Sequence, residues 1–268
     1  MTILAVLAIN ACTVAQVITN EQYEDELFRS RVKLVEGFMR RFNGTEILHT
    51  IDTTKAGYQQ KNILSLFDAQ MFGTRDDKDS VFKLARKFAD DVLGSKVKLS
   101  NTDTNWVAIA PCHGKLKGKP VDFVLVLNTE KYTKDAYRWV IAKAQGEIFK
   151  LTPSVTSIDL LISPLAHEVN FMELGRITTQ KDDWILNYKQ QQYDLDQTAV
   201  FFTYVNAGLL DIENVQGLQF VFFQMPGWVF TIQEFDRREM NSGWLITSFS
   251  KMSDIEKQKY LNYVYNKK

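Results

Sequence analysis

Apolar residues recur at three- and four-residue spacing over three stretches in the first hundred residues, as on the buried face of an amphipathic helix. This pattern predicts helices over Leu27–Phe42, Lys61–Met71 and Ser80–Leu93. Asn43-Gly44 follows the first of them and Gly94 the third, and these residue types tolerate the left-handed conformation that ends a helix. The chain therefore opens with a helical section.

The pattern changes after residue 100, where short runs of Val, Ile, Leu and aromatic residues favour β-strands. The predicted strands cover Trp106–Ala110, Val121–Thr129 and Tyr137–Phe149, and the first two are joined through a segment that contains Gly114 and Gly118. Helices followed by antiparallel strands predict an α+β arrangement with the helices on one face of a sheet.

The same order returns in shorter form after Thr152-Pro153-Ser154, which we predict to be a boundary. Helical patterns over His167–Ile177 and Gln197–Leu210 precede the second set of strand-like runs. We predict strands over Leu218–Met225, Trp228–Phe235 and Trp244–Phe249, and a last helix over Ser253–Tyr265. In the strand predicted over Trp228–Phe235, large apolar residues alternate with smaller or polar ones, as expected for a sheet with two unequal faces.

A tryptophan-anchored stretch occurs twice. Phe123 lies 16 positions before Trp139, Trp228 lies 16 positions before Trp244, and the two copies are offset by 105 residues. Internal repetition of this kind indicates two related units in one chain. The positions that the copies share are apolar, so the repeat preserves a core and carries no shared chemistry.

The order of elements, with its late Trp139-Val140-Ile141 and Trp244-Leu245-Ile246 strands, resembles the nuclear-transport-factor-2-like superfamily. Its cone-shaped α+β fold, a cystatin-like fold, is also that of ketosteroid-isomerase-like enzymes. The resemblance implies two such domains, over residues 21–152 and 153–268, each with N-terminal helices packed on a curved antiparallel sheet. The second domain has an abbreviated helical lead-in. The chain also resembles exported tandem proteins of gut bacteria whose activity is not known.

The N-terminal run Met1–Ile9 is almost uninterruptedly apolar and is followed by small residues. We expect residues 1–15 to be a signal peptide, with Thr13-Val14-Ala15 as the cleavage site. Ile9-Asn10-Ala11-Cys12 also resembles a lipobox, in which Cys12 would be lipidated. A buried helix of a cytoplasmic protein is the third alternative. The run is too short for a transmembrane helix, which needs about 20 apolar residues.

Composition narrows the choice of partner. The formal net charge is +0, which removes the usual electrostatic attraction to nucleic acid, and 45% hydrophobic residues are enough for packed cores. Cys12 and Cys112 are the two cysteines, so a processed chain has one thiol and no internal disulfide. We expect a periplasmic or outer-membrane-associated protein that meets the membrane only if Cys12 carries a lipid.

The residues that bear chemistry do not form a recognisable catalytic or metal-binding set. Cys112 and His113 are neighbours, but adjacent residues on a strand point to opposite faces, which argues against a nucleophile pair. The three histidines lack helical pairing and a CxxC partner, so we predict no metal and no cofactor.

Isomerases of the superfamily place a carboxylate and a tyrosine inside the cone. Asp122 and Tyr137, which lie on predicted strands, are residues of these two types. The repeat pairs them with Gly227 and Ser242, and no motif transfers a catalytic set. We therefore predict no catalytic residue. The residues that we expect to take part in binding are Asp122, Tyr137, Trp139, Trp228 and Trp244.

The resulting hypothesis is an exported, non-catalytic binding or scaffold protein for a small molecule or a protein partner. Superfamily members include isomerases, hydrolases and adaptors, so the fold alone does not decide the function. A small-molecule isomerase or hydrolase that uses a cone pocket is one alternative. A subunit of an envelope or secretion complex is another.

Overall fold

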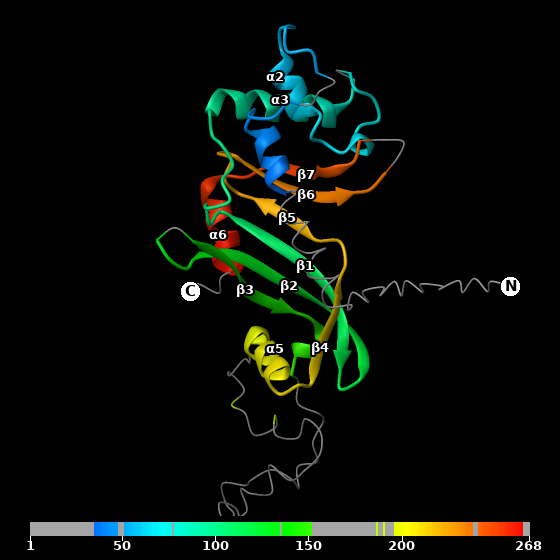
Figure 1. Cartoon of the computed structure of the whole chain (residues 1–268), viewed down its shortest axis with the longest axis vertical. Helices are drawn as coiled ribbons and strands as arrows, with labels where there is room; N and C mark the ends of the chain where they lie inside the picture. The colour runs from blue at the N-terminus through cyan, green and yellow to red at the C-terminus, as the bar shows by residue number, and fades with distance from the viewer. Residues whose placement is uncertain are drawn as a thin grey trace, which may run out of the picture.

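A computed structural model describes residues 35–47, 51–76, 78–134, 136–151, 186, 190, 196–237 and 241–264. Within this part of the chain, seven strands form one curved antiparallel sheet in the order β3-β2-β1-β5-β6-β7, and β4 pairs with β1 beside β5 (Figure 1). Helices pack on this sheet, so the predicted α+β class is confirmed.

The sheet consists of two meanders, which are runs of consecutive antiparallel strands. The first meander contains β1 (Trp106–Leu116), β2 (Lys119–Lys131) and β3 (Tyr137–Gln145). The second meander contains β4 (Leu210–Val215), β5 (Gln219–Phe222), β6 (Trp228–Phe235) and β7 (Gly243–Lys251). They meet along β1, whose beginning pairs with β5 and whose end pairs with β4. Hydrogen bonding therefore continues from one meander into the other.

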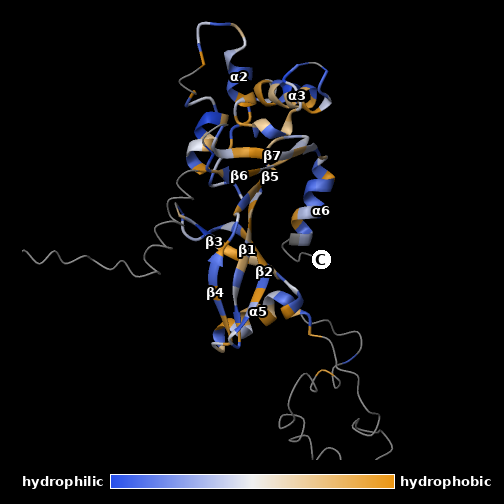
Figure 2. Cartoon of the chain, turned by 90° about the vertical axis from the view of Figure 1, so that its right-hand side faces the viewer, coloured by the Kyte–Doolittle hydropathy of each residue, from blue (hydrophilic) through white to orange (hydrophobic). Residues whose placement is uncertain are grey.

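The helices gather at the two ends of the sheet. Residues 35–42, α2 (Tyr58–Leu64) and α3 (Ser80–Ser95) lie beside β5, β6 and β7, whereas α5 (Gln197–Asn206) lies at the other end of the molecule, near β3 (Figure 1). Two 3₁₀ turns, η1 (Ala69–Met71) and η2 (Glu147–Phe149), accompany them. The last helix, α6 (Asp254–Val264), stands apart on one side of the sheet (Figure 2).

Alternation along the strands gives the sheet two different faces. Trp106 and Ala108 of β1 belong to the main core under α3 and α5, whereas Val107 between them belongs to a smaller apolar cluster that contains Leu261 of α6. Lys257 anchors α6 there, because its buried ammonium donates hydrogen bonds to backbone carbonyls at the end of β5. One face thus carries the large core and the other a single docked helix.

Each meander is covered by the helix that precedes the other one. Phe88 of α3 packs edge-on against Trp228 and Phe230 of β6, with ring centroids 5.3 and 5.6 Å apart. Phe201 of α5 packs in turn against Phe123 of β2 and Phe149 of η2, at 6.1 and 5.8 Å. The helix from the first half therefore covers strands from the second half, and the reverse is also true.

Local sequence explains where these two helices begin. The carboxylate of Asp79 accepts hydrogen bonds from the backbone N–H groups of Val81 and Phe82, and Asp196 accepts one from Thr198. A side-chain oxygen at this position satisfies N–H groups that have no partner within the helix. Both covering helices thus start at an aspartate cap.

Glycine and proline set the shape of the central strands. Lys117 and Gly118, with φ of 50° and 78°, form the two-residue turn between β1 and β2. Gly114 lies within β1 and not in the turn, and a Cβ there would come within 2.1 Å of the Asp211 carbonyl oxygen. Gly227, with φ of 71° after Pro226, turns the chain into β6.

The 105-residue offset of the sequence repeat reappears in the strand pairing. Trp139 pairs with Thr129 in the first meander, and Trp244 pairs with Glu234, 105 residues on, in the second. Each hairpin also has a register shift at the same place, after Val126 and after Thr231, which again differ by 105. The two outer hairpins therefore share one pairing register, bulge included.

Three predicted elements differ from the structure. The strand predicted over Tyr137–Phe149 is too long, because β3 ends at Gln145 and Glu147–Phe149 form η2. The helix predicted over Lys61–Met71 is wrong in its bounds, because α2 covers Tyr58–Leu64. Beyond it, the backbone N–H of Asp68 donates to the Ile246 carbonyl of β7. The helix predicted over Gln197–Leu210 ends at Asn206, and the strand β4 that follows was not predicted. Gly208, with φ of 63°, causes this early end.

Several predictions fall outside the described residues. These are the signal peptide over residues 1–15, the lipidation site Cys12, the helix over His167–Ile177 and the boundary near residue 153. The division into two domains stays a prediction, although the sheet and the main core contain residues from both of them.

Candidate functional site

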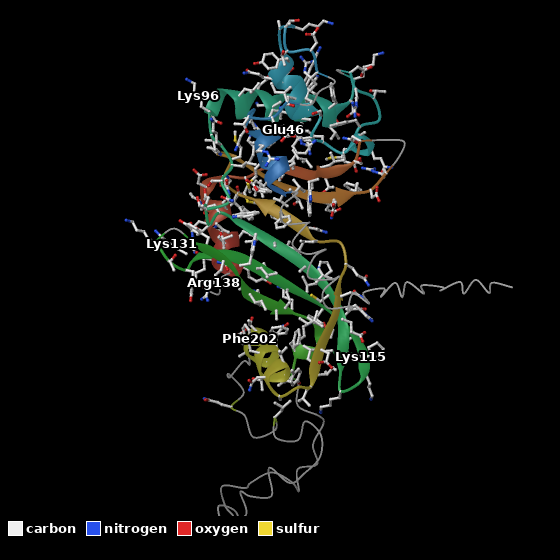
Figure 3. All side chains as sticks on the ribbon, viewed as in Figure 1. Glu46, Lys96, Lys115, Lys131, Arg138 and Phe202 are labelled. Atoms are coloured by element: carbon white, nitrogen blue, oxygen red, sulfur yellow. The ribbon has the colours of Figure 1, made fainter. Side chains whose placement is uncertain are left out.

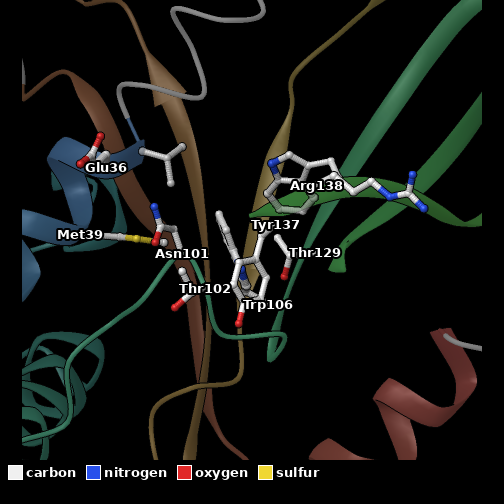
Figure 4. A pocket seen from close by; sticks show the side chains of 10 residues that line it. Glu36, Met39, Asn101, Thr102, Trp106, Thr129, Tyr137 and Arg138 are labelled. Carbon is white, nitrogen blue, oxygen red and sulfur yellow. The ribbon is translucent and has the colours of Figure 1, made fainter. Parts of the chain in front are cut away.

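A pocket of about 420 Å³ opens between the helical residues 35–42 and the start of β3 (Figure 4). We call it the aromatic pocket. Its lining consists of Val35, Glu36, Met39, Asn101, Thr102, Trp106, Thr129, Tyr137, Arg138 and Trp139. The helix supplies one wall, the loop before β1 supplies the second, and the β2–β3 hairpin supplies the third.

Three aromatic rings give the pocket its apolar surface. Tyr137 and Trp139 are two residues apart on β3, so they project to the same face of the strand. The Trp139 ring meets the buried Trp106 ring at 64°, with centroids 4.6 Å apart, and both contact Phe220. Tyr137 is 36% exposed. The two tryptophans form a fixed floor, and the tyrosine offers a ring and a hydroxyl to the opening.

The polar side chains of the pocket are mainly hydroxyls and an amide. Asn101 and Thr102 are exposed in the loop before β1, while Thr129 is buried and donates its hydroxyl to the Asp103 carbonyl at 3.0 Å. Side chains of this kind both donate and accept hydrogen bonds, so they suit neutral polar groups.

The two charged residues at the rim are paired with other residues. Arg138 reaches Glu130 at 3.3 Å and lies over the Tyr132 ring, and its side chain points away from the other labelled residues of the pocket (Figures 3 and 4). Glu36 lies 3.9 Å from Arg40 in the next helical turn. The pocket lining is therefore close to neutral, and its charges face solvent.

The five predicted binding residues are not brought together. Tyr137 and Trp139 line the aromatic pocket, and Trp244 lines a different one, which is described below. Trp228 is buried in the core, where its indole N–H donates to Asp91 at 3.0 Å. The side chain of Asp122 is 86% exposed and lies 2.7 Å from His113 Nδ1 on the neighbouring strand.

The only cysteine in the described residues is not in position to act as a nucleophile. Cys112 is buried and directs its thiol to the Ala110 carbonyl at 3.3 Å, and burial raises the pKa of this thiol to about 11. His113 faces the other side of β1, as strand alternation predicts. The thiol therefore stays protonated near neutral pH and has no adjacent base.

Within the residues that the structure describes, no three His, Cys, Asp or Glu side chains gather as a metal site would require. The same residues contain no helix with the length and apolar character that a membrane crossing needs.

Sequence reasoning missed several lining residues. Trp106 was assigned to a strand but not to a site, and Asn101, Thr102 and Glu36 come from a loop and a helix that precede the strands. The aromatic residue at the first position of a predicted strand was the one available signal. The loop residues carried none, because their position depends on how the helix packs across the sheet.

Comparisons of this chain with protein-family models, with curated protein sequences and with solved structures gave no match.

Proposed function

We propose that this is an exported, non-catalytic binding protein that holds a neutral organic molecule in the aromatic pocket. The observation that carries the proposal is the combination of three aromatic rings with neutral hydrogen-bonding groups in a pocket of about 420 Å³. Ligand pockets have this composition, with a mainly apolar lining and a few polar groups that orient the molecule.

The positions of the candidate acid and base support binding over isomerisation. An isomerase of the superfamily type needs a carboxylate beside its tyrosine in an apolar cavity. Asp122 is exposed and paired with His113, and it does not line the pocket that contains Tyr137. Glu36 does line it, but at the solvent-facing rim and next to Arg40.

The proposal includes the relationship to the nuclear-transport-factor-2-like superfamily, with two domains of that type. Helices packed on one face of a curved antiparallel sheet and the repeated hairpin register support it. Export is part of the proposal on the evidence of the N-terminal sequence. Mass spectrometry of the mature protein should find Gln16 or a lipidated Cys12 at the N-terminus, and an intact Met1 would contradict export.

Ligand binding is tested by thermal-shift screening of the purified mature protein against a metabolite library, followed by calorimetry of each hit. Tyr137→Ala and Asn101→Ala remove exposed lining groups, so each should weaken a hit at least tenfold, which corresponds to about 1.4 kcal/mol. Tyr263→Ala removes an exposed tyrosine from α6, outside the pocket, and should leave affinity unchanged. A hit that both tyrosine variants weaken equally would show that the pocket is not the site.

The same hits test the isomerase alternative. Each should be recovered chemically unchanged after prolonged incubation with the protein, as judged by NMR of the small molecule. Conversion of a hit, lost in Tyr137→Ala and retained in Tyr263→Ala, would replace the binding proposal with an enzymatic one.

A further inference from the structure

A second pocket, of about 280 Å³, lies at the irregular segment between β4 and β5, and we call it the glutamine pocket. Gln216, Gln219 and Gln233 line it together with Glu234 and Trp244. Gln219 and Gln233 are direct partners on β5 and β6. The pocket therefore has two side chains fixed by strand pairing and a third from the connecting segment.

Pro111 explains why the sheet opens here. It also lines the pocket, and it sits inside β1 between the stretch that pairs with β5 and the stretch that pairs with β4. Proline has no N–H group to donate, so a proline within a sheet is tolerated mainly at bulges. The Gln216 N–H donates to the Pro111 carbonyl at 2.8 Å, and Gly217 adopts φ of 66°. The break in the ladder forms the pocket.

The glutamine pocket occupies the place in the second meander that the aromatic pocket occupies in the first. Trp139 and its partner Thr129 line the aromatic pocket, and Trp244 and its partner Glu234, each 105 residues later, line the glutamine pocket. Both tryptophans contact the same ring of Phe220, with centroids 5.8 and 5.1 Å away. The two pockets are thus repeat-related.

The wall of the glutamine pocket contains a donor without an acceptor. Trp244 is 2% exposed, and its indole N–H has no hydrogen-bond partner among the residues that the structure describes. A buried donor in this state costs about 1–3 kcal/mol, so native structures contain few of them.

The lining selects a neutral ligand rich in hydroxyl groups. A glutamine amide both donates and accepts, as a hydroxyl group does, and three amides in one pocket match several hydroxyls on one small ring. No lysine or arginine lines the pocket, and Glu234 repels anions. A volume of about 280 Å³ is at the lower end for ligand pockets and fits one ring rather than a chain.

We propose that the glutamine pocket is a second binding site, which takes one saccharide unit. The inference goes beyond the proposed function, because it adds a site and does not require the aromatic pocket to bind anything.

The test uses the mature full-length protein and four probes, namely glucose, galactose, mannose and N-acetylglucosamine. Saturation-transfer NMR detects binding at millimolar probe, and calorimetry gives the affinity. Gln216→Ala and the double variant Gln219→Ala/Gln233→Ala should each weaken the bound sugar at least tenfold. Gln258→Ala, an exposed glutamine of α6, is the matched control and should bind as the parent does. Gln216 is itself exposed, so its variant keeps the test valid if the double variant is unstable.

Two results would overturn the inference. The first is that none of the four sugars gives a saturation-transfer signal. The second is that binding survives both glutamine variants and is lost in Tyr137→Ala, which would assign the sugar to the aromatic pocket. In that second case the proposed function stands and only the additional site is lost, so the two ideas fail separately.

Discussion

The two meanders share a pairing register but differ in what covers their tryptophans. Trp139 of the first meander borders the aromatic pocket, whereas its counterpart Trp244 is almost completely buried. Residues 66–68 lie along β7 and exchange hydrogen bonds with Ile246, while β3 pairs only with β2 within the described part of the chain. The repeat therefore preserves the strands, and residues 66–68 cover the outer edge of the second meander only.

The two covering helices differ in their aromatic contacts. α3 on the second meander contributes Phe88, whose ring contacts Phe42, Phe67, Trp228, Phe230 and Phe249. α5 on the first meander contributes Phe201, whose ring contacts Phe123, Phe149 and Phe202. The second meander thus has the denser aromatic core.

The largest effect is expected when the chain is divided at the predicted boundary. Residues 153–268 alone would expose Trp228 and Phe230, which α3 normally covers, and residues 16–152 would leave Phe88 without its partners. We expect neither fragment to fold alone and the co-expressed pair to assemble, as measured by circular dichroism and gel filtration. A cooperative thermal transition in either isolated fragment would show that the helices do not depend on the other half.

Truncation of the two core phenylalanines should reveal the difference in aromatic packing. Both Phe88→Ala and Phe201→Ala should lower the free energy of unfolding by about 3–5 kcal/mol, with Phe88→Ala the more severe. Phe202→Ala, on the outer side of α5 where the ring is 51% exposed, should change it by less than about 0.5 kcal/mol (Figure 3). Urea denaturation gives all three values. Equal losses for Phe88 and Phe201 would remove the proposed asymmetry.

The edge of the second meander should depend on one ion pair. Arg237 reaches Asp68 at 2.8 Å, and both side chains are largely buried. Asp68→Ala would leave the guanidinium without its counter-charge, so we expect a loss of about 3 kcal/mol. Hydrogen exchange should rise at Ile246 and stay low in β2. The exposed pair Arg138–Glu130 on the first meander is the control, and Glu130→Ala should have little effect.

Alkaline pH should destabilise the protein through Cys112, which has no cysteine counterpart in the second meander. The folded thiol has a pKa of about 11, against 9.0 for an ordinary thiol, so the unfolded chain releases its proton first. The free energy of unfolding should therefore fall between pH 9 and about 11. In Cys112→Ala this component of the pH dependence should vanish, as urea titrations at each pH would show. A fall of the same size in that variant would exclude the thiol as its cause.

The smallest effect is expected at Asp122, whose counterpart in the repeat is Gly227. The carboxylate is exposed, and it pairs at the surface with His113 on the neighbouring strand β1. Asp122→Ala should change the free energy of unfolding by less than about 1 kcal/mol and should leave ligand affinity unaltered. A large loss of affinity would restore Asp122 as a binding residue.

The sequence predicts strands better than it predicts the positions of helices. The predicted bounds of β6 agree with the structure, because alternation at Trp228, Phe230 and Ile232 is a local property of a half-buried strand. β4 was missed because half of its six residues are polar and its partner strand β1 lies far earlier in the chain. α3 was predicted with the correct start at Ser80, but periodicity reveals an apolar face and not the partner of that face.

The candidate site shows the same limit. Tyr137 was identified as a tyrosine of the type that isomerases of the superfamily use, and Trp139 as the anchor of the sequence repeat. Trp106, the third ring of the pocket, lies 33 residues before Trp139 in the chain. It comes close to the other two rings because β2 pairs with both β1 and β3. Pro111 could have indicated a break in a strand, but its consequence, the glutamine pocket, depends on β5, which follows more than 100 residues later.

The crosswise placement of α3 and α5 has a consequence for how the chain is made. Domains usually fold as they leave the ribosome, with the N-terminal one first. Here α3 packs on strands that end at Lys251, so it has no core to join until nearly all of the 268 residues have been synthesised. The section around α3 therefore stays without its core for most of translation. An unfolded chain is also the form that a narrow translocation channel accepts, so late folding of this section is compatible with the proposed export.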